Sequence, residues 1–141
     1  MPLSYATPEE AERSFYELIA ECDPDKLMMA WSDEEETLCV HPTGVRLTGL
    51  VPIRESWRSI FANARIRIEA DIVSHWQSSV MAIHHLTEVL YVGDDPAPHG
   101  PLHVTHVYIR GADGWRLAAR HASAADDGHQ AMADALPHTL H

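Results

Sequence analysis

The segment 103–123 constrains the fold most strongly, because it predicts a β-hairpin whose turn sets the pairing of both strands. The Ala112-Asp113 pair suits the centre of a type I turn, and Gly114 suits the left-handed residue after it. A loop of this kind predicts five pairs on one face: Gly111–Trp115, Ile109–Leu117, Val107–Ala119, Thr105–His121 and His103–Ser123. The opposite face carries three arginines, so we expect the first face to be buried. A two-residue loop is the alternative, but it places Arg110 beside Trp115, which is a poorer core.

This pairing gathers four polar side chains at one end of an otherwise apolar face, which is typical of a small-molecule pocket. His121 is the candidate catalytic residue, because an imidazole titrates near neutral pH and can act as a general acid or base. Thr105 and Ser123 are expected to orient its ring or to bind a substrate oxygen, and His103 is expected to line the pocket. The structural alternative is a buried histidine whose nitrogens are paired with a hydroxyl and a backbone carbonyl.

Length and charge narrow the class of protein. The chain has 141 residues, which suits one domain over 1–124 followed by a tail of Ala, Asp and His over 125–141. Its formal charge of −11 disfavours nucleic acid and anionic membrane surfaces as partners. Cys22 and Cys39 form no disulfide or metal motif, and neither a signal peptide nor a membrane-length apolar run is present, so we expect a cytoplasmic protein.

The order of predicted elements is helices first and strands second, which is typical of an α+β fold. Thr7 as N-cap and Pro8 in the first turn predict a helix over 8–22, and 33–36 is an acidic, solvated connector. The remaining elements are a short helix carrying Trp31, a strand over 37–41, a helix after Pro52 that ends near Asn63, and strands over 65–76, 80–92, 102–110 and 115–123. A strongly curved sheet around the helices would form a cone with a pocket between the two layers.

Several segments resemble the NTF2-like superfamily, specifically SnoaL-like and ketosteroid-isomerase-like small proteins. They are Trp31 with the acidic connector, His41-Pro42-Thr43-Gly44, Gly49 with Ile53-Arg54 and Trp57, and Gly114-Trp115-Arg116-Leu117 running into Arg120-His121-Ala122-Ser123. The resemblance covers roughly residues 8 to 124 and implies a cystatin-like cone. Because the superfamily hosts isomerases, cyclases, dehydratases, hydrolases and non-catalytic association modules, it does not by itself select an activity.

The resemblance also implies a homodimer formed through the outer face of the sheet, where we expect Val104, His106 and Tyr108. Ketosteroid isomerases place a Tyr, an Asp base and a second acid in the cavity. Tyr16 on the first helix is the expected counterpart of that Tyr, whereas no Asp of this chain matches the base. Trp57 is expected in the core and in the cavity wall.

Only one of the adjacent residues His84 and His85 can face inward from a strand. A Ser78-Ser79 loop places His85 beside Ile72, whereas a three-residue loop places His84 there; we favour His85 as the pocket residue. One of these histidines could converge with His103 and His121 on zinc or iron. Since histidines on separate strands often lie close by chance, we predict no metal ligand and no cofactor.

The resulting hypothesis is a SnoaL-like protein that binds a small apolar molecule in a conical pocket and performs cofactor-free acid–base chemistry on it. The alternatives are a non-catalytic dimeric association or ligand-binding module and a His-ligated metalloenzyme. A catalytic pocket should hold a second titratable group within hydrogen-bond reach of His121, whereas a module should have a cavity filled by side chains.

Overall fold

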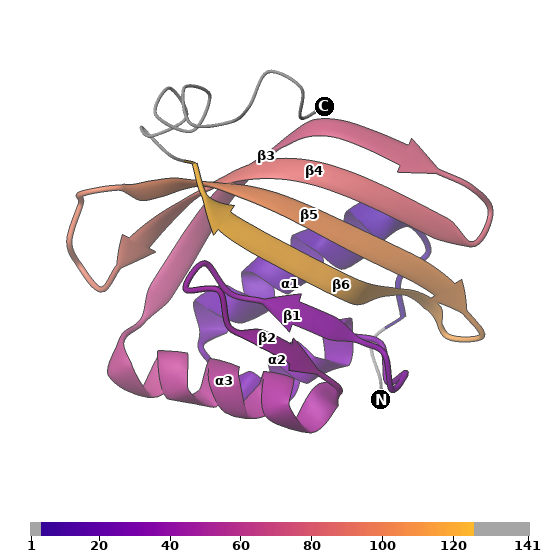
Figure 1. Cartoon of the computed structure of the whole chain (residues 1–141), viewed down its shortest axis with the longest axis horizontal. Helices are drawn as coiled ribbons and strands as arrows, with labels where there is room; N and C mark the ends of the chain where they lie inside the picture. Colours follow the sequence, from indigo (N-terminus) through magenta and orange to yellow (C-terminus); the bar gives the residue numbers. More distant parts are fainter. Residues whose placement is uncertain (1–3, 126–141) are drawn as a thin grey trace, which may run out of the picture.

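The computed structural model describes residues 4–125, so the expected tail lies, apart from residue 125, outside the described residues (Figure 1). Its elements are α1 (Pro8–Glu21), α2 (Pro24–Leu27), a 3-10 turn (Met28–Ala30), β1 (Leu38–Val40), β2 (Arg46–Thr48), α3 (Leu50–Asn63), β3 (Ile66–Gln77), β4 (Met81–Val92), β5 (His99–Gly111) and β6 (Gly114–Ala124). The predicted helices and the four long strands are confirmed to within a few residues, and β2 was not expected. No helix of the described residues is long and apolar enough to cross a membrane.

The start of α1 follows the expected capping pattern. The Thr7 hydroxyl accepts a hydrogen bond from the Glu10 backbone N–H at 3.1 Å, and the Glu10 carboxylate accepts one from the Ala6 N–H at 2.8 Å. These bonds satisfy N–H groups that a helix start leaves without partners. Cys22 closes the helix in the left-handed conformation. The cap therefore fixes where α1 begins.

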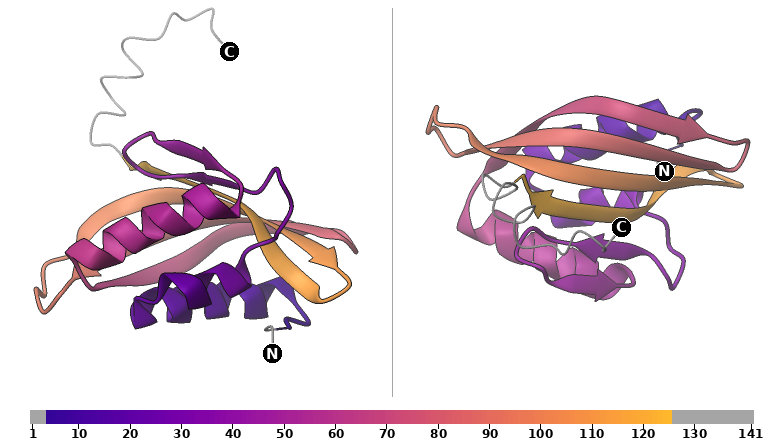
Figure 2. Two further views of the ribbon diagram at one scale, coloured as in Figure 1. Left: turned by 90° about the horizontal axis from the view of Figure 1, so that it is seen from below. Right: turned by 45° about the horizontal axis from the view of Figure 1, so that its top comes forward.

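The six strands form one curved, unclosed sheet in the order β2-β1-β6-β5-β4-β3. All neighbours are antiparallel except β1 and β6, which are parallel. The helix α1 packs against β3 and β6, and α3 packs against α2 and β2 (Figure 2). This arrangement is the predicted α+β, cystatin-like architecture.

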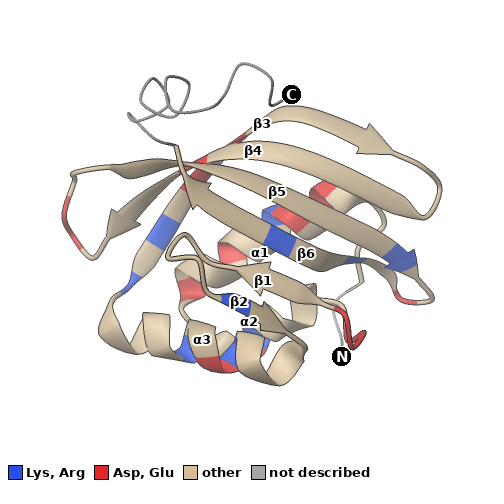
Figure 3. Cartoon of the chain, in the orientation of Figure 1, with Lys and Arg blue, Asp and Glu red and all other residues tan. Residues whose placement is uncertain are grey.

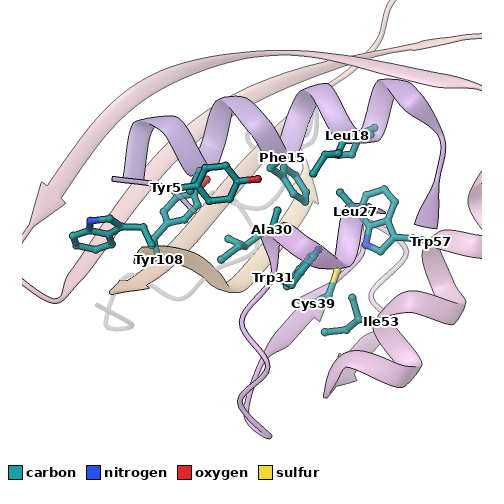
Figure 4. Close-up of a cluster of buried hydrophobic side chains, with 14 of the residues drawn as sticks. Tyr5, Phe15, Leu18, Leu27, Ala30, Trp31, Cys39, Ile53, Trp57 and Tyr108 are labelled. Carbon is teal, nitrogen blue, oxygen red and sulfur yellow. The ribbon is translucent and has the colours of Figure 1, made fainter. Parts of the chain in front are cut away.

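Aromatic side chains fill the space between α1, α3 and the sheet (Figure 4). Phe15 of α1 is fully buried, and its ring meets those of Trp31 and Trp57 edge to face, with centroids 6.0 and 6.2 Å apart. Trp57 is 2% exposed, and Phe61 packs on it from the next turn of α3. The centre of the predicted cone is thus a packed core.

The β5–β6 hairpin agrees with the predicted pairing at its far end and differs near its turn. Thr105 pairs with His121 and His103 with Ser123, as predicted. The turn itself has two residues, so Arg110 pairs with Trp115, and the pairs Gly111–Trp115 and Ile109–Leu117 are wrong. Val107 pairs with Ala119 and Tyr108 with Leu117, so Ala118 of β6 is an extra residue that restores the predicted pairing beyond it.

The predicted burial of this hairpin is wrong. His121, His103 and Ser123 are exposed and Thr105 is half-buried, whereas Arg120 and Ala122 are buried against the helices. Val104, His106 and Tyr108, which we expected on the outer face, are likewise buried. The reason is that only one of the three arginines, Arg120, lies deep on the inner face, and it has an acidic partner there.

We use the term outer face for the side of β4, β5 and β6 that points away from the helices. Among residues 4–125 no element covers it, and its residues are exposed or half-buried (Figure 1). Its members are Met81, Ile83, His85 and Thr87 of β4, His103, Thr105, Val107 and Ile109 of β5, and Arg116, Ala119, His121 and Ser123 of β6.

Candidate functional site

Seven polar side chains meet on the inner face of the sheet and form one hydrogen-bonded cluster, which we call the inner network. They come from α1 and from the three central long strands: Glu12, Tyr16, His84, Glu88, His106, Tyr108 and Arg120. Glu12 and Tyr16 are one helical turn apart on α1, and the strand residues alternate with apolar ones. The spacing of helix and strand thus brings all seven to one face of each element.

Glu12 is the acceptor at one end of the inner network. Its Oε1 lies 2.8 Å from His84 Nδ1 and accepts a hydrogen bond from the Tyr108 hydroxyl at 3.3 Å. His106 Nδ1 lies 2.9 Å from the same hydroxyl. Burial alone would raise the pKa of Glu12, but the neighbouring imidazoles of His106 and His84 outweigh it and lower the pKa to about 2. Glu12 is therefore ionised at neutral pH.

Glu88 and Arg120 form the other end. The Arg120 guanidinium donates to both oxygens of Glu88, at 2.6 and 2.8 Å, and the Tyr16 hydroxyl donates to Oε2 at 2.6 Å. Burial opposes ionisation of Glu88, but the charge and hydrogen bonds of Arg120 lower its pKa. Burial and the charge of Glu88 raise the pKa of Tyr16, which stays protonated. His106 lies 2.9 Å from Arg120, and burial lowers its pKa.

A groove between α1 and β3, here the α1–β3 groove, reaches this network. It has a volume of about 590 Å³ and is lined by Glu9, Glu12, Arg13, Tyr16, Glu17 and Ala20 of α1 and by Ile68, Ala70 and Ile72 of β3. Tyr16, expected as a substrate-binding residue, is half-buried at this groove. Glu12 and Tyr16 are the members of the inner network that line it.

The predicted pocket residues of the hairpin line a different concavity, on the outer face. It measures about 490 Å³ and includes His85, His103, Thr105, His121 and Ser123. Thr105 lies 3.2 Å from His85 Nδ1, but across residues 4–125 no titratable side chain is hydrogen-bonded to His121. The expected polar residues are thus brought together, on the solvent side of the sheet. A catalytic role for His121 stays a prediction.

His84 and His85 exchange their expected roles. His84 is fully buried and bonded to Glu12, whereas His85 is exposed. Gln77 pairs with Ala82, so neither of the two predicted loops forms, and a β-bulge in β3 between Ile72 and Ser74 then places Leu86 opposite Ile72. Along β4 the buried residues are Ala82, His84, Leu86 and Glu88, so His84 shares the inner face with them. Across residues 4–125, no group of three or more His, Cys, Asp or Glu side chains is placed to hold a metal ion.

Sequence reasoning missed Glu88 and Arg120 as partners. A signal for Glu88 exists: it follows Ala82, His84 and Leu86 at spacing two, on the face that turns out to be buried. What the sequence lacks is any local indication that this carboxylate meets an arginine 32 positions later.

These features define the class of protein: a curved sheet wrapped around helices, as in NTF2-like proteins with a cystatin-like fold. The sequence profile of the SnoaL-like domain family matches residues 9–127, so the chain belongs to that family. Membership supports a ligand-binding or isomerase-like domain without specifying an activity. No curated protein matches the sequence of this chain.

Two solved structures are similar in both sequence and fold. A protein from Thiobacillus denitrificans described as a calcium/calmodulin-dependent protein kinase type II association domain is 34% identical, with 88% of this chain and 99% of that chain covered and a TM-score of 0.82. A protein from Streptomyces avermitilis described as a dehydratase of the NTF2-like family is 26% identical, with 82% and 91% covered and a TM-score of 0.70.

Proposed function

We propose that the chain is a non-catalytic association module, and that two copies dimerise through the outer face. The observation that carries this proposal is the composition of that face, which is apolar and histidine-rich and holds no carboxylate. The helices cover the opposite side of the sheet, where aromatic side chains fill the cone. The packed centre of the cone supports a module, because we expect the cavity of such a module to be filled by side chains.

Charge favours a second copy as the occupant of the outer face. The chain carries a formal charge of −11, so two copies repel each other at most surfaces. Glu88 is the one acidic residue of β4, β5 and β6, and its side chain bonds Arg120 on the inner face. The red segments in Figure 3 otherwise lie mainly on the helices, on β3 and on connecting loops. Within β4, β5 and β6 the outer face therefore carries no carboxylate, and the acidic residue beside it is Asp71 of β3, which pairs with Thr87 at its edge.

The apolar part of the outer face supports the same partner. Ile83 pairs with Trp76 on one side and Val107 on the other, which forms a cross-strand apolar row. Trp76 is 56% exposed and Met81 is 38% exposed, so a second copy on this face would remove large apolar side chains from water. A twofold dimer would place the same row on both sides of the interface.

The similarity to the association domain from Thiobacillus denitrificans adds support, since that protein is 34% identical and nearly its whole length is covered. The similarity extends over nearly the whole of both chains. In this chain the polar groups of the inner network bond one another, Arg120 to Glu88 and His84 to Glu12.

Sedimentation equilibrium over a wide range of protein concentration tests the proposal. We expect a mass twice the 15.8 kDa of one chain, and Ile83→Glu should shift it to the monomer because it places a carboxylate in the apolar row. Val51→Glu is the matched control, because Val51 is 70% exposed on α3, away from the outer face. A monomeric wild-type chain, or equal weakening by both variants, would overturn the proposal.

A small-molecule-binding domain is the second candidate function, and the α1–β3 groove is the observation that favours it. Its volume of about 590 Å³ suits a small organic ligand. Glu12 and Tyr16 would contact such a ligand, and both are hydrogen-bonded to further titratable groups, as acid–base chemistry requires. Chemical-shift changes of α1 and β3 amides on addition of apolar fragments would support this function, and unchanged spectra would contradict it.

A further inference from the structure

We propose that the α1–β3 groove binds a protonated organic amine with an apolar body, and that its ammonium group contacts Oε2 of Glu12. The inference rests on the second candidate function, small-molecule binding, and is independent of self-association. It assigns a chemical class to the ligand, which neither the fold nor the family membership supplies.

The Glu12 carboxylate is buried at the wall of the groove. Its side chain is only 8% exposed, and its contacts to His84, Tyr108 and His106 all go to Oε1. Within residues 4–125 the other oxygen, Oε2, has no hydrogen-bond partner, although Glu12 lines the groove. A buried, ionised carboxylate with one unpaired oxygen favours a charged donor at that position.

The α1 wall of the groove carries more acidic than basic side chains. Glu9, Glu12 and Glu17 line it together with a single cation, Arg13. Their spacing puts all four on one stripe of α1, so their fields add at the groove. Negative charge therefore predominates, which attracts cations and repels anionic ligands.

The wall of the groove opposite the carboxylates is apolar. Ile68, Ala70 and Ile72 come from β3, and Ala20 closes the groove from the last turn of α1. Ile72 is 45% exposed, so part of this wall is open to solvent unless a ligand covers it. A hydrocarbon body would gain by covering this surface, whereas a small hydrated metal ion would not.

Arg120, the buried cation of the inner network, is already paired. Its two Nη groups donate to Glu88 at 2.6 and 2.8 Å, and Arg120 does not line the groove. A carboxylate ligand would thus find only Arg13 as a partner. This selects the amine over an acid with the same hydrocarbon body.

Three probes of one chain length test the proposal: hexylammonium, 1-hexanol and hexanoate, each titrated into the ¹⁵N-labelled full chain. We expect hexylammonium to shift the amides of Ala20, Ala70 and their neighbours and to bind at least tenfold more tightly than 1-hexanol. Hexanoate should bind more weakly than either. Added salt should weaken hexylammonium binding, because exposed Glu9 and Glu17 contribute to it.

Variants separate charge from shape. Glu12→Gln should reduce hexylammonium binding to the level of 1-hexanol, whereas Glu36→Gln, which removes the same charge from the exposed acidic connector, should leave it unchanged. Ala70→Leu should block hexylammonium and 1-hexanol alike, because it fills the groove without altering the inner network. This variant and the probe comparison keep the proposal testable if Glu12→Gln does not fold.

The outcomes separate the assignment of an amine ligand from the binding of small molecules in the groove. Equal binding of hexylammonium and 1-hexanol, or tighter binding of hexanoate, would overturn the amine assignment and leave small-molecule binding intact. Binding that Ala70→Leu does not affect would place the ligand outside the groove and overturn the site. If none of the three probes shifts an α1 or β3 amide, both the amine assignment and the second candidate function fail.

Discussion

Arg120 is the residue on which the inner face depends most. It is 3% exposed, and a cation at such a depth is tolerated only when an anion and further hydrogen bonds replace the lost water. Glu88 supplies the anion through both of its oxygens, and His106 and Tyr16 complete the surroundings. Through these four side chains α1 is bonded to β4, β5 and β6.

Removing one charge should therefore cost more than removing both. Arg120→Met leaves Glu88 buried without its cation, and we expect the free energy of unfolding to fall by about 3–5 kcal/mol. The double variant with Glu88→Leu should lose clearly less than this, because no charge stays buried without a partner. Urea denaturation of the wild type and both variants measures the difference. A double variant less stable than Arg120→Met would contradict this account.

At the scale of elements, the N-terminal segment and the β5–β6 turn are joined by a backbone contact. The Trp115 N–H donates to the Tyr5 carbonyl at 2.9 Å, and Tyr5 lies alongside Gly114 as an isolated bridge. Gly114 has a φ of +93°, and a Cβ there would lie 2.4 Å from the Tyr5 carbonyl oxygen. Glycine suits this position for two reasons: the backbone has a positive φ, and the Tyr5 backbone lies too close to leave room for a Cβ.

Gly114→Ala should consequently displace the N-terminal segment. Gly44→Ala is the matched control, since Gly44 has a φ of +92° and a Cβ there would meet no atom within 4 Å. We expect the control to lose about 1 kcal/mol from backbone strain alone, and Gly114→Ala to lose at least about twice that. Urea denaturation and amide exchange of Trp115 measure both effects. Equal losses of unfolding free energy in the two variants would show that the close approach of Tyr5 to Gly114 does not contribute to stability.

Local signals explain which elements could be predicted from the sequence. The N-cap at Thr7 and the alternation along β3 act within a few residues, and both elements form as predicted. The hairpin shows the limit of such signals. A shorter turn and a bulge at Ala118 cancel each other, so Thr105 still pairs with His121 although the predicted loop is wrong.

The candidate site could not be predicted in the same way, because it depends on contacts between distant segments. Three arginines argue for a solvent face when each is considered alone. Arg120 is nevertheless buried because Glu88, on another strand, neutralises it. The same holds for His84, whose partner, Glu12, lies 72 positions earlier in the chain. Burial of a charged group is decided by its partner, and the partner is a property of the fold.

For the whole molecule, the buried titratable groups define a pH range of maximal stability. The pKa values of His41 and His106 are lowered by burial, so below pH 6.5 the unfolded chain takes up their protons first and the folded state loses stability. Glu12 and Glu88 act in the same direction below pH 4.5. On the alkaline side, burial raises the pKa of Cys39 from 9.0 to about 11, so stability also falls above pH 9.

The free energy of unfolding should therefore be highest between about pH 7 and 9 and should fall steadily as the solution is acidified. Because the pKa of Glu12 moves from 4.5 to about 2, its ionisation alone contributes about 3 kcal/mol, which is lost between these two pH values. Urea denaturation at one fixed protein concentration, repeated across this pH range, measures the profile. His41→Gln should flatten its slope between pH 7 and 5, because the lowered pKa of His41 causes part of the decline there. A wild-type stability that rises as the pH falls from 7 to 5 would contradict the burial of neutral histidines in this fold.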